Sequence, residues 1–516
     1  MAKRSKKAKK AKLLAAATAP GAAAAITPAV TVRHYCQGIG DCHLLCFPKA
    51  DGNVFRMLID CGIHPSVKGG PATIDEIVAD IRTVTGGKID ILVVTHEHWD
   101  HVSGFSTASE LFKDFTVDEV WMAWTENAAE PLAAQLDKYK GQALAALQSA
   151  SRKLDSERNL SLHLSGIRNG LQSILGFQFG ARGDRVRGAR DAAAKLAGPK
   201  TPTYLGPDSA PISIAGLPGL RIYVLGPPRN KTLLNLQEQA NEMYQLSARS
   251  GWPLERALNA GLAASAGGGA GAQVDESAPF DRNIGTDLSA VLAGPADSEI
   301  GHFIRDHYAG PVETSAPAPA KKRGKKLPDE NLIDQSWRRI DTDWLGIAAD
   351  LALQLDRGVN NTSLVLAFEF TDTGRVVLFP GDAQVGNWLS WQPLTWTVGT
   401  KEVKAVDLLA RTVYLKVAHH GSQNATLQQH GLELMTSADL SAFIPTNEAD
   451  AKKVGWGEMP YHSILTALAA KTAGRIVRAD DAWIRQANGK PGFAFPSGSI
   501  LAVRSDGKRW VELDIA

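Results

Sequence analysis

Three of the thirteen histidines, His96, His98 and His101, fall within six residues, directly after a short apolar run at 89–95. That run is short and rich in β-branched residues, which predicts a buried strand. Side chains two residues apart in an extended segment point the same way, so His96 and His98 share one side. Asp100 lies among the histidines, and imidazole and carboxylate groups suit zinc, manganese or iron. The segment predicts a metal site at the end of a strand.

Similar short apolar runs recur in the first quarter and the last third of the chain, with helix-forming residues between them. Strands are predicted at 54–61, 89–95, 117–124, 219–225, 363–370, 375–379, 412–417, 442–445, 475–478, 499–503 and 510–515. Helices are predicted at 73–84, 128–154, 184–196, 233–247, 333–351, 425–435 and 462–472. Strands, then helices, then strands again indicate a layered α/β core interrupted by mostly helical insertions.

Composition excludes several classes of protein. The chain of 516 residues is 44% hydrophobic, an ordinary value for a globular protein and too high for full disorder. Its net charge of +2 argues against a globally basic nucleic-acid binder. The four cysteines, Cys36, Cys42, Cys46 and Cys61, form no CxxC pair. Reduced cysteines of a cytoplasmic protein are therefore predicted, with a structural zinc knuckle as the weaker alternative.

The amino-terminal segment is basic and then rich in alanine. Seven of the first twelve residues are Lys or Arg, and a charge-free run follows at 13–30. Alanine is weakly apolar and the run contains Pro20, Gly21 and Pro28, so a membrane span is not expected. Residues 1–29 are predicted to be a disordered arm and the location to be cytoplasmic, with a secretory signal as the alternative.

Several motifs resemble the metallo-β-lactamase fold superfamily when read in order. The HxHxDH run at 96–101 is the most specific of them. The others lie at 37–41, 58–62, 224–227, 360–365, 378–383 and 415–422. The last, LKVAHHGS, is similar to a branch that includes the soluble carboxy-terminal domain of ComEC-type DNA-uptake proteins and related phosphodiesterases. The resemblance covers roughly 31–125, 200–230 and 358–480.

The resemblance implies a four-layer αβ/βα sandwich with two metal ions at one edge. Residues 30–516 would form this domain, with insertions at about 126–200 and 231–357 and linker-like stretches at 263–275 and 311–328. By analogy, His96 and His98 hold the first metal, Asp100 and His101 hold the second, and Asp382 bridges both. Two divalent transition-metal ions are expected as cofactors, zinc first and manganese as the alternative.

Other residues near the motifs have more than one possible role. One of His419 and His420 would coordinate a metal while the other contacts the scissile phosphate or protonates the leaving oxygen, with His420 favoured for the second role. Asp100 would also hold the attacking hydroxide. His462 is predicted as the last ligand of the second metal, with a surface histidine at a helix start as the alternative. Asp60 would orient a ligand histidine or the motif loop, or simply form a turn.

One family histidine has no clear counterpart here. Members of the superfamily carry a further metal-binding histidine between the HxHxDH run and the bridging Asp. The candidates are His163, His302 and His307, whereas Gly226 and Pro227 stand where the strand after residue 219 ends. The first metal is therefore predicted to be under-coordinated and labile.

These observations predict a metal-dependent hydrolase, a phosphodiesterase or nuclease that uses a metal-activated hydroxide. The alternatives are hydrolysis of a small lactone, thioester or amide, and a non-catalytic regulatory module stabilised by metal. A nucleic acid or nucleotide is the expected substrate, and basic tracts at 3–12 and 321–326 would contact its phosphates or be solvated. Trp388, Trp391 and Trp396 are expected in the core, with stacking on nucleobases as the alternative.

Overall fold

The computed structural model describes residues 27–65, 67, 73–156, 168–169, 171–172, 175, 184–236, 239, 241–243, 291, 293–295, 298–307, 358–454, 456–486 and 489–516. Most of the predicted arm, both linker-like stretches and the helix predicted at 333–351 lie outside these residues.

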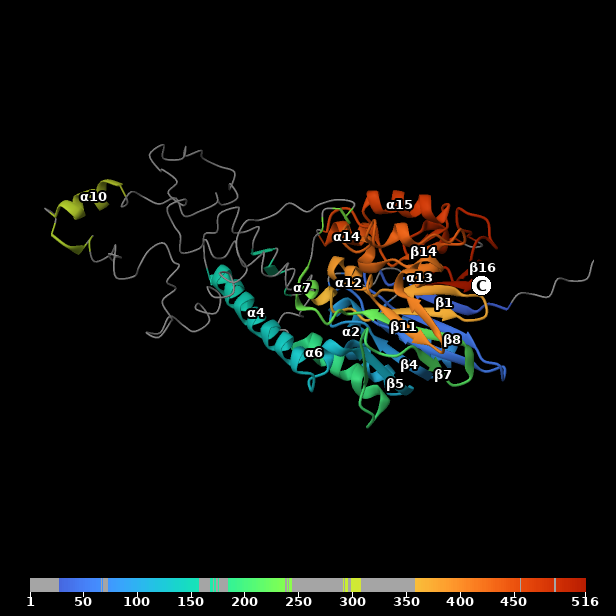
Figure 1. Ribbon diagram of the computed structural model, residues 1–516. Helices are drawn as coiled ribbons and strands as arrows, with labels where there is room; N and C mark the ends of the chain where they lie inside the picture. Colours follow the sequence, from blue (N-terminus) through green and yellow to red (C-terminus); the bar gives the residue numbers. More distant parts are fainter. Residues whose placement is uncertain are drawn as a thin grey trace, which may run out of the picture.

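Two large β-sheets form the centre of the described part of the chain (Figure 1). The first sheet has the order β16 (Ile500–Ser505), β17 (Trp510–Ile515), β1 (Val30–Tyr35), β2 (His43–Pro48), β3 (Val54–Ile59), β4 (Lys88–Val94), β5 (Thr116–Ala123) and β6 (Thr203–Leu205). The second has the order β15 (Ile476–Arg478), β14 (Ser441–Ile444), β13 (Thr412–Lys416), β10 (Arg375–Phe379), β9 (Val365–Phe370), β8 (Leu217–Gly226) and β7 (Ile212–Ile214). A separate hairpin joins β11 (Thr395–Val398) to β12 (Lys401–Lys404).

Helices cover the outer face of each sheet. Against the first sheet pack α1 (Ile74–Thr85), α2 (Trp99–Thr107), α3 (Ser109–Phe112) and α6 (Asp184–Ala194). Against the second pack α12 (Val385–Ser390), α13 (Ala405–Ala410) and α15 (His462–Thr472). The remaining described helices are η1 (Trp124–Glu126), α4 (Pro131–Ser156), η3 (Lys195–Ala197), α7 (Lys231–Leu234), α10 (Glu299–His307), η6 (Ala418–Gly421), η7 (Leu432–Leu434), α14 (Glu448–Lys453) and η8 (Ala482–Arg485). The predicted four-layer αβ/βα sandwich is confirmed.

The burial of the strands explains their sequence patterns. β17 alternates, burying Val511, Leu513 and Ile515 in the core between the sheets while intervening residues are partly exposed. In β4 every residue from Ile89 to Val94 is buried, because this strand is covered by the second sheet on one face and by helices on the other. A continuous apolar run therefore replaces alternation in the strand that precedes the histidine motif.

Parallel pairing brings the motifs to one edge. β3, β4, β5 and β6 are parallel in the first sheet, as are β10, β13, β14 and β15 in the second. The backbone amide of Leu364 donates to the Thr95 carbonyl at 2.8 Å and so ties the two sheets together at this edge. The carboxyl ends of parallel strands are where ligands bind in α/β sheets, and here they carry the predicted site residues.

The described parts of the predicted insertions are helical. α4 and α6 belong to the segment 126–200, and α4 runs away from the sandwich (Figure 1). Within the described residues, no helix combines the length and the apolar character needed to cross a bilayer.

One predicted helix does not form, whereas three tryptophans lie in the core as expected. The helix predicted at 425–435 is wrong, because the segment forms turns and the single 3₁₀ turn η7. Gly431 has φ −140° and ψ −100°, which lie outside the helical region, so the chain turns there instead of continuing as a helix. The tryptophans belong to the core: Trp388 and Trp391 are fully buried with ring centroids 4.1 Å apart, and Trp396 is 6% exposed.

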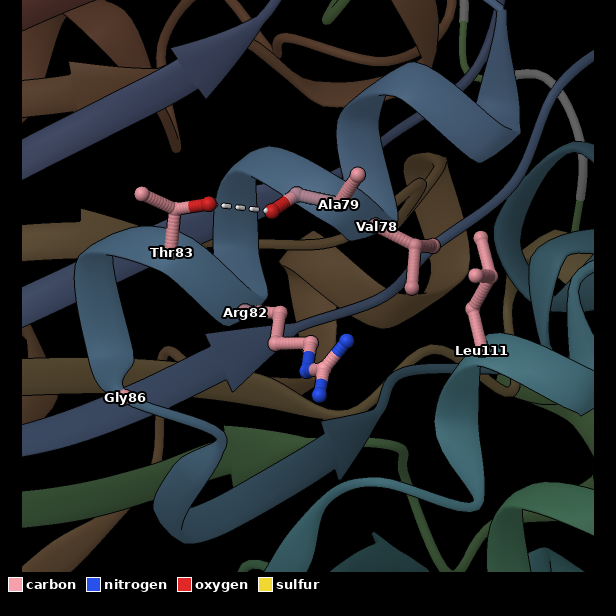
Figure 2. A pocket seen from close by; sticks show the side chains of 6 residues that line it. All are labelled: Val78, Ala79, Arg82, Thr83, Gly86 and Leu111. Atoms are coloured by element: carbon pink, nitrogen blue, oxygen red, sulfur yellow. Dashed lines mark hydrogen bonds between the residues drawn. The ribbon is translucent and has the colours of Figure 1, made fainter.

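A surface hollow of about 410 Å³ lies beside α1 (Figure 2). It is lined by Val78, Ala79, Arg82, Thr83, Gly86 and Leu111. It contains none of the predicted site residues, and Arg82 pairs with the exposed Asp114 at 3.1 Å. The hollow is therefore separate from the predicted site.

Candidate metal centre

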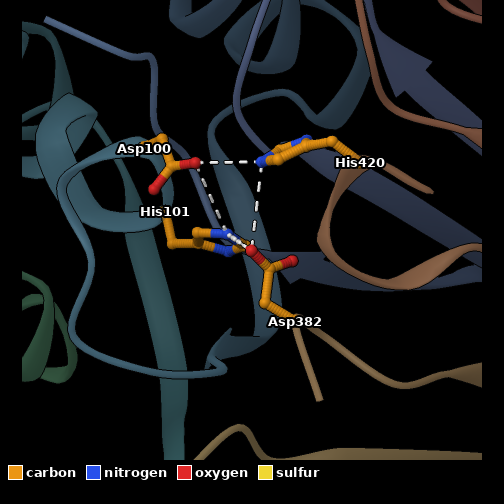
Figure 3. A group of neighbouring side chains, drawn as sticks. All are labelled: Asp100, His101, Asp382 and His420. Carbon is orange, nitrogen blue, oxygen red and sulfur yellow. Dashed lines mark hydrogen bonds and ion pairs between the residues drawn. The ribbon is translucent and has the colours of Figure 1, made fainter. Parts of the chain in front are cut away.

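Four buried side chains from three separate segments converge at the carboxyl edge of the strands (Figure 3). Asp100 and His101 lie in the first turn of α2, Asp382 follows β10, and His420 follows β13. Each offers one ligand atom, and these atoms all lie within 4.8 Å of one another. We call Asp100, His101, Asp382 and His420 the four-residue cluster.

The contacts inside the cluster join each histidine to carboxylates. His101 Nε2 lies 3.1 Å from Asp382 Oδ2 and 3.9 Å from Asp100 Oδ2. His420 Nε2 lies 3.0 Å from Asp100 Oδ2 and 3.9 Å from Asp382 Oδ2. The sequence prediction named all four as site residues, and the structure brings them together although residues 101 and 382 are far apart in the chain.

The other two motif histidines form a pair beside the cluster. His96 Nε2 and His98 Nδ1 are 3.0 Å apart, and both side chains are buried. The rings of His96 and His101 lie 4.2 Å apart between centroids. The predicted ligands of the first and second metals are thus adjacent, as a two-metal site requires.

Asp382 presents one oxygen to the cluster and uses the other for positioning. Its Oδ1 accepts from the backbone amide of His419 at 3.1 Å and lies 3.5 Å from Lys416 Nζ. Its own amide donates to Ser363 Oγ at 3.1 Å. Oδ2, the atom near the two histidines of the cluster, is therefore the oxygen left for a metal.

Asp60 orients both His101 and the motif loop, as predicted. Its Oδ1 accepts from the Thr95 amide at 2.8 Å, and its Oδ2 accepts from the Thr95 hydroxyl at 2.6 Å. Oδ2 also lies 2.8 Å from His101 Nδ1, which leaves His101 Nε2 to point at the cluster. A hydrogen bond on the far nitrogen of a ligand histidine fixes its tautomer and direction.

The backbone at this edge is held in unusual conformations. Among the described non-glycine residues with positive φ are Asp60 (57°), His419 (44°) and His420 (55°). Such conformations cost on the order of 1–3 kcal/mol each and concentrate at functional sites. Gly62 is required for a different reason, since a Cβ there would lie 2.3 Å from the Asp100 carbonyl oxygen.

The donor set fits divalent transition metals. His101 Nε2 and Asp100 Oδ1 are buried and make no hydrogen bond of good geometry, although His101 Nε2 lies 3.1 Å from the Asp382 carboxylate. Buried polar atoms nearly always have one, so two orphaned ligand atoms in one cluster indicate a partner that is not a protein group. Nitrogen and carboxylate oxygen are the ligands that zinc and manganese take in proteins.

The charges of the cluster also suit a cation. Burial lowers the pKa of His101, but nearby carboxylates, Asp382 foremost, outweigh this effect and raise its pKa well above the ordinary value. Burial opposes ionisation of Asp382, yet His101 and Lys416 hold its pKa well below the ordinary range. Protonated imidazoles thus balance buried carboxylates in the metal-free protein. Metal binding would release those protons.

A second group of possible metal ligands lies next to the cluster, and a buried lysine balances its negative charge. Asp41, Asp60 and His101 place their ligand atoms within 4.8 Å of one another. However, the buried Lys416 ammonium ion-pairs with Asp41 and donates to the Gly381 carbonyl at 2.9 Å. Lys416 therefore supplies the positive charge there, and this group supports the site rather than forming another one.

His419 and His420 occupy different environments. His420 belongs to the cluster, and its Nδ1 lies 2.6 Å from the Pro445 carbonyl oxygen. His419 Nδ1 lies 2.6 Å from Ser422 Oγ and 3.1 Å from Gln384 Nε2. His419 Nε2 faces the amide of Asn360 at 3.4 Å. His420 thus lies with the other predicted ligands and His419 lies outside the cluster, whereas the sequence had favoured His420 for the role at the phosphate.

The predicted peripheral histidines lie elsewhere. His462 is exposed at the first position of α15 and belongs to neither donor group among the described residues. His302 is exposed on α10, whereas His163 and the His307 side chain lie outside the described part. At the end of β8 a Cβ on Gly226 would lie 2.1 Å from Asn387 Oδ1, so no histidine fits there.

Sequence reasoning missed three residues that shape the site: Lys416, Gln384 and Asn360. Lys416 had a readable signal, because a lysine at the end of the apolar strand 412–416 must be paired if it is buried. Asn360 begins the motif at 360–365, although the motif gave it no role, and Gln384 had no signal, since its importance comes from a contact with His419, which is distant in sequence.

A four-layer αβ/βα sandwich that gathers histidines and aspartates at its strand ends is the architecture of a metal-dependent hydrolase. Residues 38–136, which run from just before β2 into α4, match the family model of the metallo-beta-lactamase superfamily. The resemblance seen in the motifs is thereby confirmed at the level of the superfamily. A comparison with curated proteins finds no match to the chain. The similarity to the ComEC-type branch rests on motifs outside the matched range.

Proposed function

We propose that the chain is a metal-dependent phosphodiesterase that acts on a nucleic acid or a nucleotide. The observation that carries the proposal is the four-residue cluster, with His419 and Asn360 beside it as polar groups that no ligand role requires. The neighbouring pair of His96 and His98 supports two metals rather than one.

Each residue has a distinct part in this proposal. One metal would be held by His96 and His98. The other would be held by Asp100, His101 and His420, and Asp382 would lie between the two metals. Paired divalent ions acidify water and polarise phosphoryl oxygens, which supplies both the nucleophile and charge stabilisation. The protein keeps Asp100 and Asp382 buried and ionised, so that they orient the nucleophile and balance the cations.

His419 and Asn360 would contact the substrate phosphate. His419 is held by a ring of contacts in which Ser422 donates to Asn424 at 3.1 Å and Asn424 donates to Gln384 at 3.0 Å. Burial lowers the pKa of His419 to about 4, so at neutral pH it is uncharged. It would therefore contact the substrate through Nε2 as a neutral imidazole rather than act as a cationic acid.

The test is hydrolysis of a substrate panel by protein of known metal content. The panel holds bis(4-nitrophenyl) phosphate, cyclic nucleotides, DNA, RNA, a lactone and a thioester. We expect one to two transition-metal ions per chain, cleavage of phosphodiesters, and loss of cleavage after chelation. Cleavage of the lactone or thioester alone would favour the alternative hydrolase. Metal binding without any turnover would favour a regulatory module.

Removal of the basic arm tests whether the substrate is a polynucleotide or a small phosphodiester. When a protein neutralises phosphates of a single-stranded nucleic acid, the logarithm of its affinity falls linearly with the logarithm of the salt concentration. The slope is about −0.7 per contacted phosphate. Protein lacking residues 1–29 should show a flatter slope on a polynucleotide and an unchanged rate on bis(4-nitrophenyl) phosphate. An unchanged slope would favour a small phosphodiester.

Asn360→Ala should reduce kcat/KM for a phosphodiester by roughly 10- to 100-fold, the value of one hydrogen bond to a charged group. Stability should change little, because Asn360 Oδ1 has no partner in the protein. Asn361 is the matched control: its amide donates to the Leu234 and Leu236 carbonyls at 3.1 and 2.8 Å, so Asn361→Ala should lower stability instead. Steady-state kinetics, metal content and calorimetry with inorganic phosphate measure these effects. Unchanged kinetics and phosphate binding in Asn360→Ala would remove Asn360 from the site.

A further inference from the structure

The residue between His96 and His98 is tied to the helical insertion. Glu97 is 2% exposed, and its Oε2 accepts from Lys140 Nζ of α4 at 2.9 Å. The same oxygen accepts from Arg190 Nη1 of α6 at 2.8 Å. Both cations come from the segment 126–200, which the motifs of the sandwich do not include.

The contact is part of an arrangement of largely buried charges, in which Arg190 also pairs with the exposed Asp191 at 2.8 Å. Arg190 Nη1 also donates to Glu126 Oε2 of η1 at 2.8 Å. We call Glu97, Glu126, Lys140 and Arg190 the charge network. Two carboxylates balance two cations, and the side chains are only 3, 6, 14 and 17% exposed, respectively. Removing one member of such a buried network leaves an uncompensated charge, so its partners are strongly held in place.

The same helices also contact the segment that follows the loop. α6 packs against α2, whose first turn carries Asp100 and His101. The Arg185 guanidinium lies 4.9 Å from the centre of the Trp99 ring. The insertion therefore contacts the motif on both sides of His98, through charge at Glu97 and through packing at α2.

From this placement we propose that Glu97 is a positioning residue that fastens the loop carrying His96 and His98 to the insertion. The insertion then sets how tightly this histidine pair binds metal. The pair needs such support because no histidine fits at Gly226 to complete it. The proposal requires the metal site but not the phosphodiesterase assignment, and it is tested by metal binding alone.

Glu126 provides the matched control. Glu97→Gln and Glu126→Gln each remove one carboxylate charge from the same network and from contact with the same Arg190, but only Glu97 lies on the ligand loop. Zinc affinity is measured by competition with a chromogenic chelator, and the ligand field by the absorption spectrum after cobalt substitution. We expect Glu97→Gln to weaken zinc binding at one site by roughly 10- to 100-fold and to change the cobalt spectrum. Glu126→Gln should leave the zinc affinity and the cobalt spectrum unchanged. Glu97→Gln and Glu126→Gln should each unfold at a lower temperature than the wild-type protein.

Equal effects of the two variants on zinc affinity and on the cobalt spectrum would overturn the proposal, as would no effect of either. They would show that the network contributes only to general stability. If Glu97→Gln does not fold, Lys140→Met takes its place, since it removes one of the two cations on Glu97 from a helix that carries no ligand. A changed cobalt spectrum and weaker zinc binding in Lys140→Met would support the coupling, whereas wild-type values would contradict it.

Discussion

Asp382→Asn is expected to lower phosphodiester hydrolysis by about three orders of magnitude or more and to reduce the metal content, with the fold retained. The amide has nearly the same shape, but it lacks the negative charge that faces His101 and His420 through Oδ2. This change in rate corresponds to the loss of several kcal/mol of transition-state stabilisation that depends on the metals, since each 1.36 kcal/mol changes the rate tenfold. Metal analysis, steady-state kinetics and circular dichroism measure the three expectations.

Asp372 is the control for this substitution. It is an exposed residue in the turn between β9 and β10, ten positions before Asp382. Asp372→Asn should leave rate, metal content and fold unchanged. A near-normal rate and metal content in Asp382→Asn would reduce Asp382 to a turn residue after Gly381 and would remove the bridging role.

Lys416→Met should destabilise the protein by about 3–5 kcal/mol, the usual consequence of removing one partner of a buried ion pair. Lys416 is 1% exposed, ion-pairs with Asp41 and lies 3.5 Å from Asp382 Oδ1. Burial lowers the pKa of this lysine, yet Asp41 and Asp382 outweigh burial and raise it, so the ammonium is charged at neutral pH. Methionine of similar volume would leave two buried carboxylates without their cation. Chemical denaturation of chelator-treated protein measures the change.

Two further variants serve as controls for this prediction. Asp41→Asn combined with Lys416→Met removes a carboxylate together with its cation and should recover a large part of the lost stability. Lys404 forms an exposed ion pair with Glu402 at 3.5 Å, so Lys404→Met should change stability by no more than about 0.5 kcal/mol. A loss below about 1 kcal/mol for Lys416→Met would mean that water or rearrangement compensates the carboxylates.

The sequence alone predicted most of the central strands and named the residues of the four-residue cluster, but it did not predict β6, β7, β11 or β12. Hydrophobic periodicity is a local property, so the apolar run before His96 predicts β4, and the motif itself names His96, His98, Asp100 and His101. Asp382 could be named as well, because it follows a strand and a glycine in a recognisable order. The strand and helix patterns also predicted a layered α/β core, since each element buries an apolar face that only another layer can cover, whereas the four-layer sandwich followed from the resemblance to the superfamily.

The tertiary structure decided which of two neighbouring histidines joins the four-residue cluster. His419 and His420 are adjacent and chemically identical, and only the positive-φ turn after β13 sends His420 to Asp100 and His419 to Gln384. The expected helix at 425–435 had suitable composition, but packing of the segment against α13 and the second sheet overrode that preference.

Long-range contacts decided the rest. The sequence assigned Glu97 no role, and folding brings Lys140 and Arg190 to it from a different part of the chain. The pairing of Asp41 with Lys416 joins strand ends from opposite sheets. Periodicity and motif spacing report on the nearest few residues, whereas the charge balance of a buried site depends on groups that only folding brings within a few ångströms of one another.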